Sequence, residues 1–437
     1  MPAEPRALKT PAEQALSAAF AAARGSLPGE GAVGKLREVA FERFDAAGLP
    51  HRRVEEWKYT DLRALMREAR PLAGPAGAKP QGNIAPILSG IETDRIAIVN
   101  GRYEPTWSDA KVSDPGVTVA ELFEFVADNP DYRLGQVPGT DDPAYWLNTA
   151  FMSGGVALRI RRGGSVAKPV HIAHVFSGDA AAAMYPRSVV VVEPGAQLTL
   201  IESFCGPEGV DYQVNSALEL VIGDGARVDH IKVGCDGGAA LRVSTLGVTV
   251  GAKAAYKDFA FTLGGAVVRN QTFVRFAGEG SEGAIDGASL LKGRQHVDNT
   301  LVIDHAVGHC TSRERFKSVL DGESHGIFQG KIIVEPHAQK TDGKMMTRAL
   351  LLSDEAEADN KPELEIFADD VVCGHGATAG ALDPGLKFYL MSRGIPAAEA
   401  EALLIQAFIG EVVEEIAHEG IREALMFAAL KWLGSRS

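Results

Sequence analysis

Cys373 and His375 are the residues whose types and spacing most directly suggest chemistry. They lie in Asn360–Gly380, where apolar and polar residues alternate on both sides of Asp369–Asp370. Alternation predicts β-strands, and residues two apart on a strand share one face, about 6–7 Å apart. A thiolate and an imidazole placed in this way supply half of the ligands for a soft metal ion. A buried thiol beside a histidine that caps a turn fits the pattern equally well.

The other histidines and cysteines do not have the spacing of a closed four-ligand metal site. Seven of the eleven histidines fall between His230 and His375. The tightest group is His305, His309 and Cys310, but adjacent residues of a strand point to opposite faces, so His309 and Cys310 would diverge. This trio is therefore a weaker candidate for metal binding than Cys373 with His375.

A phosphate-binding loop is suggested by Gly29–Lys35 (GEGAVGK), but two features argue against it. The next residue is Leu36, where such loops carry the Ser or Thr that binds Mg²⁺, and no apolar strand precedes the segment. We therefore expect no nucleotide hydrolysis by this chain.

The central part of the sequence predicts a β-solenoid. Short β-branched runs alternate with Gly-rich corners from Gly155 to about residue 376. Three corners begin alternating runs, namely Gly195-Ala196, Gly225-Ala226 and Gly251-Ala252, with separations of 30 (225 − 195) and 26 (251 − 225) residues. Such a period, with two or three strands in each, indicates stacked coils that bury one another's apolar faces. A bicupin or a β-sandwich is the structural alternative.

Helices are predicted on both sides of this β core. The N-terminal candidates are 11–24, 33–46 and 54–70, followed by a Pro-, Gly- and Ala-rich linker at 71–90. After Asp383-Pro384 three further helices are expected, which either cap the solenoid or dock a partner. The predicted division is an N-terminal helical region with linker (1–90), a β core (91–383) and a C-terminal helical region (384–437).

Charge and cysteine usage narrow the class of protein. The 437 residues carry a net charge of −13, which argues against nucleic acid and anionic membranes as partners, because phosphate contacts need clustered Lys and Arg. The four cysteines are far apart and form no CxxC pair, as expected for reduced thiols. The N-terminus lacks a signal-peptide pattern, and no apolar run reaches membrane-spanning length. We expect a soluble, cytoplasmic protein.

Six segments, taken in order along the chain, carry a resemblance to a known family. They are Glu55–Arg63 (EEWKYTDLR), Leu147–His174 (LNTAFMSGGVALRIRRGGSVAKPVHIAH), His296–Ile303 (HVDNTLVI), Phe328–Ile332 (FQGKI), Ala338–Asp342 (AQKTD) and the segment that contains Cys373 and His375. Together they resemble the SufB/SufD family of iron–sulfur cluster assembly proteins, from about residue 50 to the C-terminus. One alternative from another class is a β-solenoid carbohydrate-active enzyme of the polysaccharide lyase kind, suggested by the repeats and scattered acidic residues.

Two features resemble the SufD branch of this family more than the SufB branch. His375 is followed by Gly376, where SufB relatives usually carry Glu, and Thr347–Ser353 contains no cysteine, although the sulfur-accepting cysteine of SufB lies in the matching region. One departure is Gly374, where SufD relatives often have Ser. This change removes no ligand.

The resemblance implies a right-handed parallel β-helix in a scaffold subunit that is not itself catalytic. It implies a SufB-like partner at one end of the β-helix and a SufC-like ATPase on the C-terminal helices. Cys373 and His375 match SufD positions implicated in cluster assembly, so they would hold iron or a nascent iron–sulfur cluster together with ligands from the SufB-like subunit. A flavin in the assembled complex and a homodimer of the isolated chain are left open.

Overall fold

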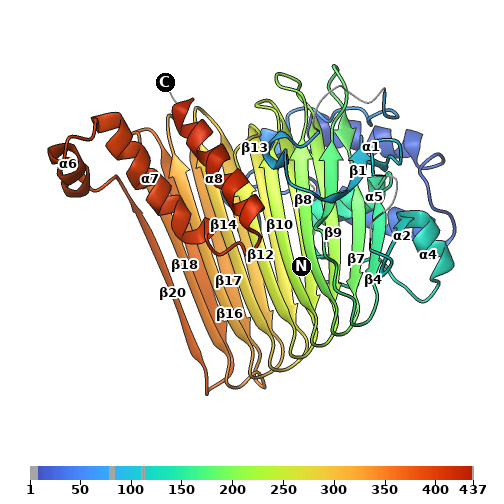
Figure 1. Cartoon of the computed structure of the whole chain (residues 1–437). Helices are drawn as coiled ribbons and strands as arrows, with labels where there is room; N and C mark the ends of the chain where they lie inside the picture. Colours follow the sequence, from blue (N-terminus) through green and yellow to red (C-terminus); the bar gives the residue numbers. More distant parts are fainter. Residues whose placement is uncertain (1–7, 78–83, 110–111, 113, 436–437) are drawn as a thin grey trace, which may run out of the picture.

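The computed structural model describes residues 8–77, 84–109, 112 and 114–435. Residues 1–7 of the predicted N-terminal region and 78–83 of the predicted linker lie outside these ranges. The centre of the molecule is a solenoid of stacked coils, each made of one strand from each of two facing sheets (Figure 1). The predicted β-solenoid is therefore confirmed, and the bicupin and sandwich alternatives are excluded.

The two sheets are almost entirely parallel. The first sheet contains, in spatial order, β2 (Arg102–Tyr103), β1 (Asp94–Val99), β5 (Val170–Val175), β8 (Gln197–Cys205), β10 (Arg227–Cys235), β12 (Ala255–Thr262), β14 (Glu282–Leu291), β16 (Thr311–Leu320), β18 (Asp342–Leu351) and β20 (Val372–Gly380). The second contains β19 (Glu357–Ile366), β17 (His325–Val334), β15 (His296–His305), β13 (Val267–Phe276), β11 (Leu241–Val250), β9 (Gln213–Ile222), β7 (Arg187–Val192), β4 (Val156–Ile160) and β3 (Val117–Glu121), and β6 (Ala183–Met184) pairs with β9. Among the described strands, only the β1–β2 and β3–β4 pairs are antiparallel. The right-handed sense implied by the resemblance is the one that parallel crossovers nearly always take.

The repeat follows from the register between coils. From β5 to β20, successive first-sheet strands are offset by 27 residues (Ala255 to Glu282) to 31 residues (Thr311 to Asp342). The predicted corner at Gly251-Ala252 lies between β11 and β12, but the residue in register with Gly225 is Lys253 rather than Gly251. Lys253 adopts a φ of 54° there, so a lysine occupies the left-handed turn position that glycine favours.

The N-terminal helices pack against the outer face of the second sheet. They are α1 (Pro11–Ala23), α2 (Ala32–Ala47), α3 (Leu62–Leu65), α4 (Leu122–Asp128) and α5 (Pro143–Phe151), with the 3₁₀ turn η1 (Glu55–Trp57). The 3₁₀ turn η2 (Pro86–Leu88) instead packs on the first sheet. The helices predicted at 11–24 and 33–46 are confirmed. The single helix predicted at 54–70 is wrong: η1 and α3 are short because Trp57 is fully buried beside the sheet and fixes an irregular path.

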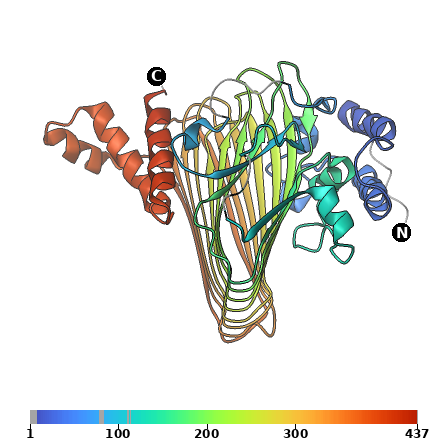
Figure 2. The ribbon, with the colours of Figure 1, turned by 45° about the vertical axis from the view of Figure 1, so that its right-hand side comes forward.

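The three predicted C-terminal helices are present as α6 (Pro384–Ser392), α7 (Ala397–Val413) and α8 (Glu419–Gly434). Helices α7 and α8 cover the outer face of the first sheet through a shared apolar cluster, on the side opposite the N-terminal helices (Figure 2). Helix α6 lies beyond the last coil and has no buried residue (Figure 1). Among the described residues, no helix is both long and apolar enough to cross a membrane.

Candidate functional site at the open end of the solenoid

The last coil leaves one end of the solenoid open. Strand β19 pairs only with β17 and β20 pairs only with β18, so the outer edges of both strands have no partner in the described chain. Phe367 and Val372, which lie between these two strands and at the start of β20, are each 60% exposed. Unpaired edges flanked by exposed apolar side chains are suited to pairing with another chain.

Cys373 and His375 lie on this last coil, in β20, as the alternation predicts. Cys373 is half-buried and packs against the interior core of the solenoid, whereas His375 is exposed. Their register partners on β18 are Gly343 and Met345. The chain thus presents a thiol and an imidazole from one strand at an open end.

The thiol of Cys373 is protonated in the isolated chain at neutral pH. Burial raises its pKa, and the Asp342 carboxylate adds to this effect, although a hydrogen bond from the Gly343 backbone opposes it. A metal ligand must be a thiolate, so binding iron here would displace this proton. Affinity for a soft cation should therefore fall as the pH falls.

Within the described residues, no group of three or more His, Cys, Asp or Glu side chains is placed to hold a metal ion. The predicted trio does not converge: His309 is an exposed residue with a φ of 61°, whereas His305 and Cys310 are fully buried. Cys373 and His375 thus supply two ligands at most, fewer than the four that iron–sulfur clusters commonly need.

Gly374 separates the two candidate ligands without crowding them. A Cβ atom built on Gly374 meets no atom within 4 Å. The Ser that is common in SufD relatives would fit without displacing Cys373 or His375, so the departure at this position does not alter the placement of the pair.

Polar residues lie inside the solenoid next to this end. Glu314 shares the inward face of β16 with Ser312, whose hydroxyl lies 3.0 Å from His305 Nε2. Glu314 is fully buried, and burial raises the pKa of its carboxyl to about 8. Burial likewise lowers the pKa of His305 to about 4. Both side chains are therefore neutral at pH 7, so the interior of the solenoid can hold them without a charged partner.

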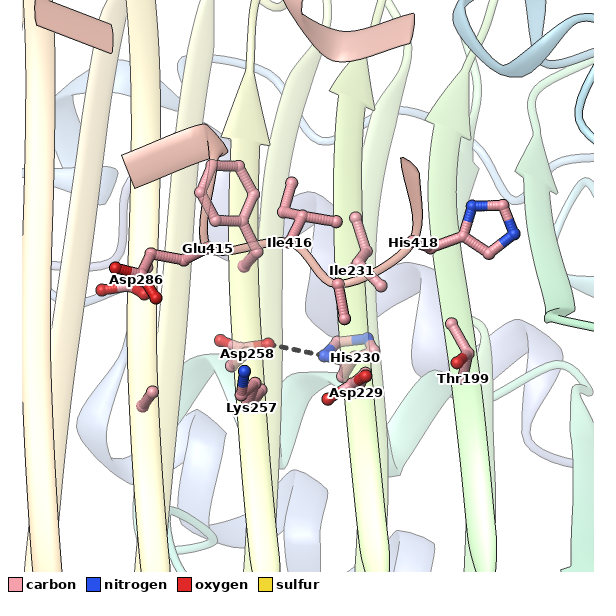
Figure 3. A pocket seen from close by; sticks show the side chains of 13 residues that line it. Thr199, Asp229, His230, Ile231, Lys257, Asp258, Asp286, Glu415, Ile416 and His418 are labelled. Carbon is pink, nitrogen blue, oxygen red and sulfur yellow. Dashed lines mark hydrogen bonds and ion pairs between the residues drawn. The ribbon is translucent and has the colours of Figure 1, made fainter. Parts of the chain in front are cut away.

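A small pocket lies elsewhere, between the first sheet and the connection from α7 to α8 (Figure 3). Its volume is about 30 Å³, room for about one water molecule. Arg315 joins Asp286 of the sheet (2.8 Å) to Glu415 of this connection (2.7 Å), which fixes the helices in place. The cavity contains neither Cys373 nor His375 and is best explained by helix packing.

Two local patterns mislead when the sequence is read alone. Gly322–Gly326 (GESHG) matches the serine-hydrolase elbow pattern, but it turns from β16 into β17 and Ser324 is fully buried, so it is not a strand–turn–helix elbow. The cysteines are distant in sequence, yet Cys205 and Cys235 are register partners on β8 and β10. Their separation of 30 residues (235 − 205) equals one coil, which is the signal that could have revealed the pairing.

Comparison with known proteins gives a consistent family. A profile described as "SUF system FeS cluster assembly, SufBD core domain" matches residues 174–408, and "SufBD protein N-terminal region" matches 14–172. Iron-sulfur cluster assembly protein SufD of Escherichia coli is 31% identical over 87% of this chain and 88% of its own length. SufD of Bacillus subtilis is 30% identical (90% and 92%), and a SufBD family protein of Synechocystis is 29% identical (87% and 86%). The chain belongs to the SufBD family of iron–sulfur cluster assembly proteins.

Proposed function

We propose that this chain is a scaffold subunit for iron–sulfur cluster assembly that does not hydrolyse ATP. The open end of its solenoid pairs with a SufB-like subunit, and helices α6–α8 dock a SufC-like ATPase that supplies the energy for rearrangement. Cys373 and His375 hold iron or a nascent cluster as substrate, with the remaining ligands supplied by the SufB-like chain. The family match favours this role over a carbohydrate-active enzyme.

One observation carries the proposal: an incomplete ligand pair lies on a coil whose sheet edges are unpaired. A complete site within one chain would need no partner, and an open edge without ligands would indicate association alone. Their coincidence favours a site shared between two chains. A cytoplasmic location, a flavin in the complex and a homodimer without the SufB-like subunit stay predictions.

The docking role of the C-terminal region is supported by the surface of α6. Leu386, Phe388, Tyr389 and Met391 are between 43% and 72% exposed. A helix with so much exposed apolar and aromatic area is suited to covering by another protein.

Copurification tests the assembly. The full chain is coexpressed with tagged SufC-like ATPase and with a SufB-like subunit from the same genome. We expect a stable complex that contains all three chains. If the chain is folded but elutes without the SufC-like ATPase and without the SufB-like subunit, the assignment is contradicted.

His375→Ala tests the ligand role. The variant complex should assemble normally but bind less iron and sulfide after reconstitution, because one of the two ligands from this chain is lost. His337→Ala is the matched control, since His337 is an exposed histidine on a turn of the same solenoid, and it should leave the cluster yield unchanged. An unchanged yield for His375→Ala would remove His375 from the site.

A further inference from the structure

Cys205 and Cys235 form a thiol pair that the proposed cluster site does not use. Each is the last residue of its strand, β8 and β10, and the two residues are in register. Adjacent strands lie about 4.8 Å apart, within the range of about 4.4–6.8 Å between Cα atoms that a disulfide spans. The pair lies five strands along the first sheet from β20, which carries Cys373.

The two sulfur atoms face each other. Cys235 Sγ donates a hydrogen bond to the Phe204 carbonyl oxygen at 3.3 Å, which directs this sulfur toward β8. Cys205 is the register partner of Cys235, and both cysteines border the same hollow. Both side chains therefore lie next to each other on the outer face of the sheet.

The two thiols differ in access. Both border a hollow of about 490 Å³ that is also lined by Ile84, Pro86 and Pro207. Cys205 is only 8% exposed, whereas Cys235 is half-buried, so a small reagent reaches Cys235 first. The neighbouring Cys235 thiol and burial both raise the pKa of Cys205. Cys205 therefore stays a protonated thiol while Cys235 reacts first.

We propose that Cys205 and Cys235 are a peroxide-sensitive dithiol that closes to a disulfide across the ends of β8 and β10. The Cys235 sulfur attacks hydrogen peroxide, the O–O bond breaks, and Cys235 sulfenic acid and one water form. Cys205 sulfur then displaces the sulfenic hydroxyl, the S–S bond forms, and the Cys205 proton leaves with the hydroxide as a second water. Two thiols and one peroxide thus give one disulfide and two waters.

The fold allows this closure at small cost. A disulfide needs Cβ atoms about 3.5–4.5 Å apart, slightly closer than in-register strands usually hold them. Because β8 and β10 both end at these cysteines, the approach displaces strand ends and leaves the ladder before them intact.

The other two cysteines are internal controls. Cys310 is fully buried, and its sulfur lies 3.5 Å from the Gly278 and Gly308 carbonyl oxygens. Cys373 is half-buried on the last coil. Among the described residues, the Cys310 sulfur contacts backbone carbonyl oxygens and Cys373 is in register with Gly343, so neither faces another thiol and oxidation there would stop at the sulfur acids.

The test uses the full chain, reduced, freed of metal by a chelator and treated with graded hydrogen peroxide. Remaining thiols are alkylated, and peptides are mapped by mass spectrometry without reduction. We expect two of the four thiols to disappear together, with one cross-linked peptide that joins Cys205 to Cys235 and that dithiothreitol reverses. Cys373→Ser should form the same cross-link, whereas Cys235→Ser should form none.

The proposal is overturned if Cys235 advances to sulfinic acid without a cross-link, or if both cysteines stay alkylatable while Cys373 is oxidised. Cross-links between other cysteine pairs at equal yield would also overturn it. The wild-type peptide map decides these outcomes, so the result does not depend on whether a variant folds.

Discussion

At the scale of single residues, Glu314 shows how the interior of the solenoid sets the charge of a side chain. In the described part of the chain no hydrogen bond of normal geometry reaches either carboxyl oxygen of Glu314. Burial raises the pKa to about 8 from a usual value of 4.5. The Glu314 carboxyl stays protonated in the folded chain at a pH at which it ionises in the unfolded chain, and this difference makes the stability depend on pH.

The sign of this dependence gives a prediction. Between about pH 4.5 and pH 8 the folded chain holds a proton on Glu314 that the unfolded chain releases, so the free energy of unfolding falls as the pH rises. The full effect is roughly 3–5 kcal/mol. Glu314→Gln removes this pH dependence. Thermal melting should therefore show that the stability of the variant, relative to the wild type, increases from pH 5 to pH 8.

The exposed Glu323 supplies the control for this comparison. Glu323→Gln should show no comparable gain on the wild type, because its side chain is 62% exposed and makes only a surface ion pair with Arg294. A stability difference between Glu314→Gln and the wild type that stays constant from pH 5 to pH 8 would show that Glu314 is ionised in the folded chain.

At the scale of elements, the segment from Glu55 to Thr60 connects the N-terminal region to the second sheet. The Trp57 indole N–H donates to Asp142 at 2.8 Å, and the Arg269 guanidinium lies 3.9 Å from the centre of its ring. Arg269 also donates to the Glu56 carbonyl oxygen at 2.6 Å and forms an ion pair with Asp298. The segment is therefore held to the sheet by the buried Arg269, and the Thr60 hydroxyl adds a hydrogen bond to Asp298 at 2.5 Å.

Asp298→Ala should destabilise this junction strongly. The side chains of Arg269 and Asp298 are 1% and 0% exposed, so removing the carboxylate leaves a buried, unpaired guanidinium at a cost of about 3–5 kcal/mol. Urea unfolding followed by tryptophan fluorescence measures it. Glu323→Ala breaks the exposed Arg294–Glu323 pair, which has the same 29-residue spacing, and should cost less than about 1 kcal/mol. Equal effects of the two variants would contradict a stabilising role for the buried pair.

At the scale of the whole molecule, the two ends of the solenoid differ. The N-terminal end finishes in the antiparallel strands β2 and β3 and lies near the N-terminal helices, whereas the other end finishes in the unpaired edges of β19 and β20 (Figure 1). Helix α6 extends beside this open end and exposes its own apolar face. The molecule therefore has two adjacent but separate surfaces suited to partners.

These surfaces can be separated by mutation. Phe367→Asp places a charge at the open end and should weaken pairing with the SufB-like subunit roughly tenfold or more, while the SufC-like ATPase still binds. Phe388→Asp on α6 should do the reverse. Phe367 and Phe388 are 60% and 72% exposed, so neither change should lower the melting temperature. Pulldowns with each partner measure the effects, and loss of both partners in either variant would contradict separate surfaces.

The fold class, both helical regions and the strand that carries Cys373 and His375 were predictable from the sequence. Each rests on a pattern within some thirty residues: alternation in strands, helical periodicity, and corners that recur once per coil. The errors have the same origin. The helix predicted at 54–70 has helix-compatible composition, but burial of Trp57 against the sheet decides its path, and no local pattern encodes that contact.

What the sequence by itself determined is therefore the period and the side-chain types, including one thiol and one imidazole on a common face. The tertiary structure decided which residues meet across coils: Cys205 beside Cys235, Glu314 sealed in the interior, and Cys373 with His375 at an end that no further coil covers. The physical reason is that stacking fixes the register between segments about 30 residues apart, and this register sets both burial and pairing.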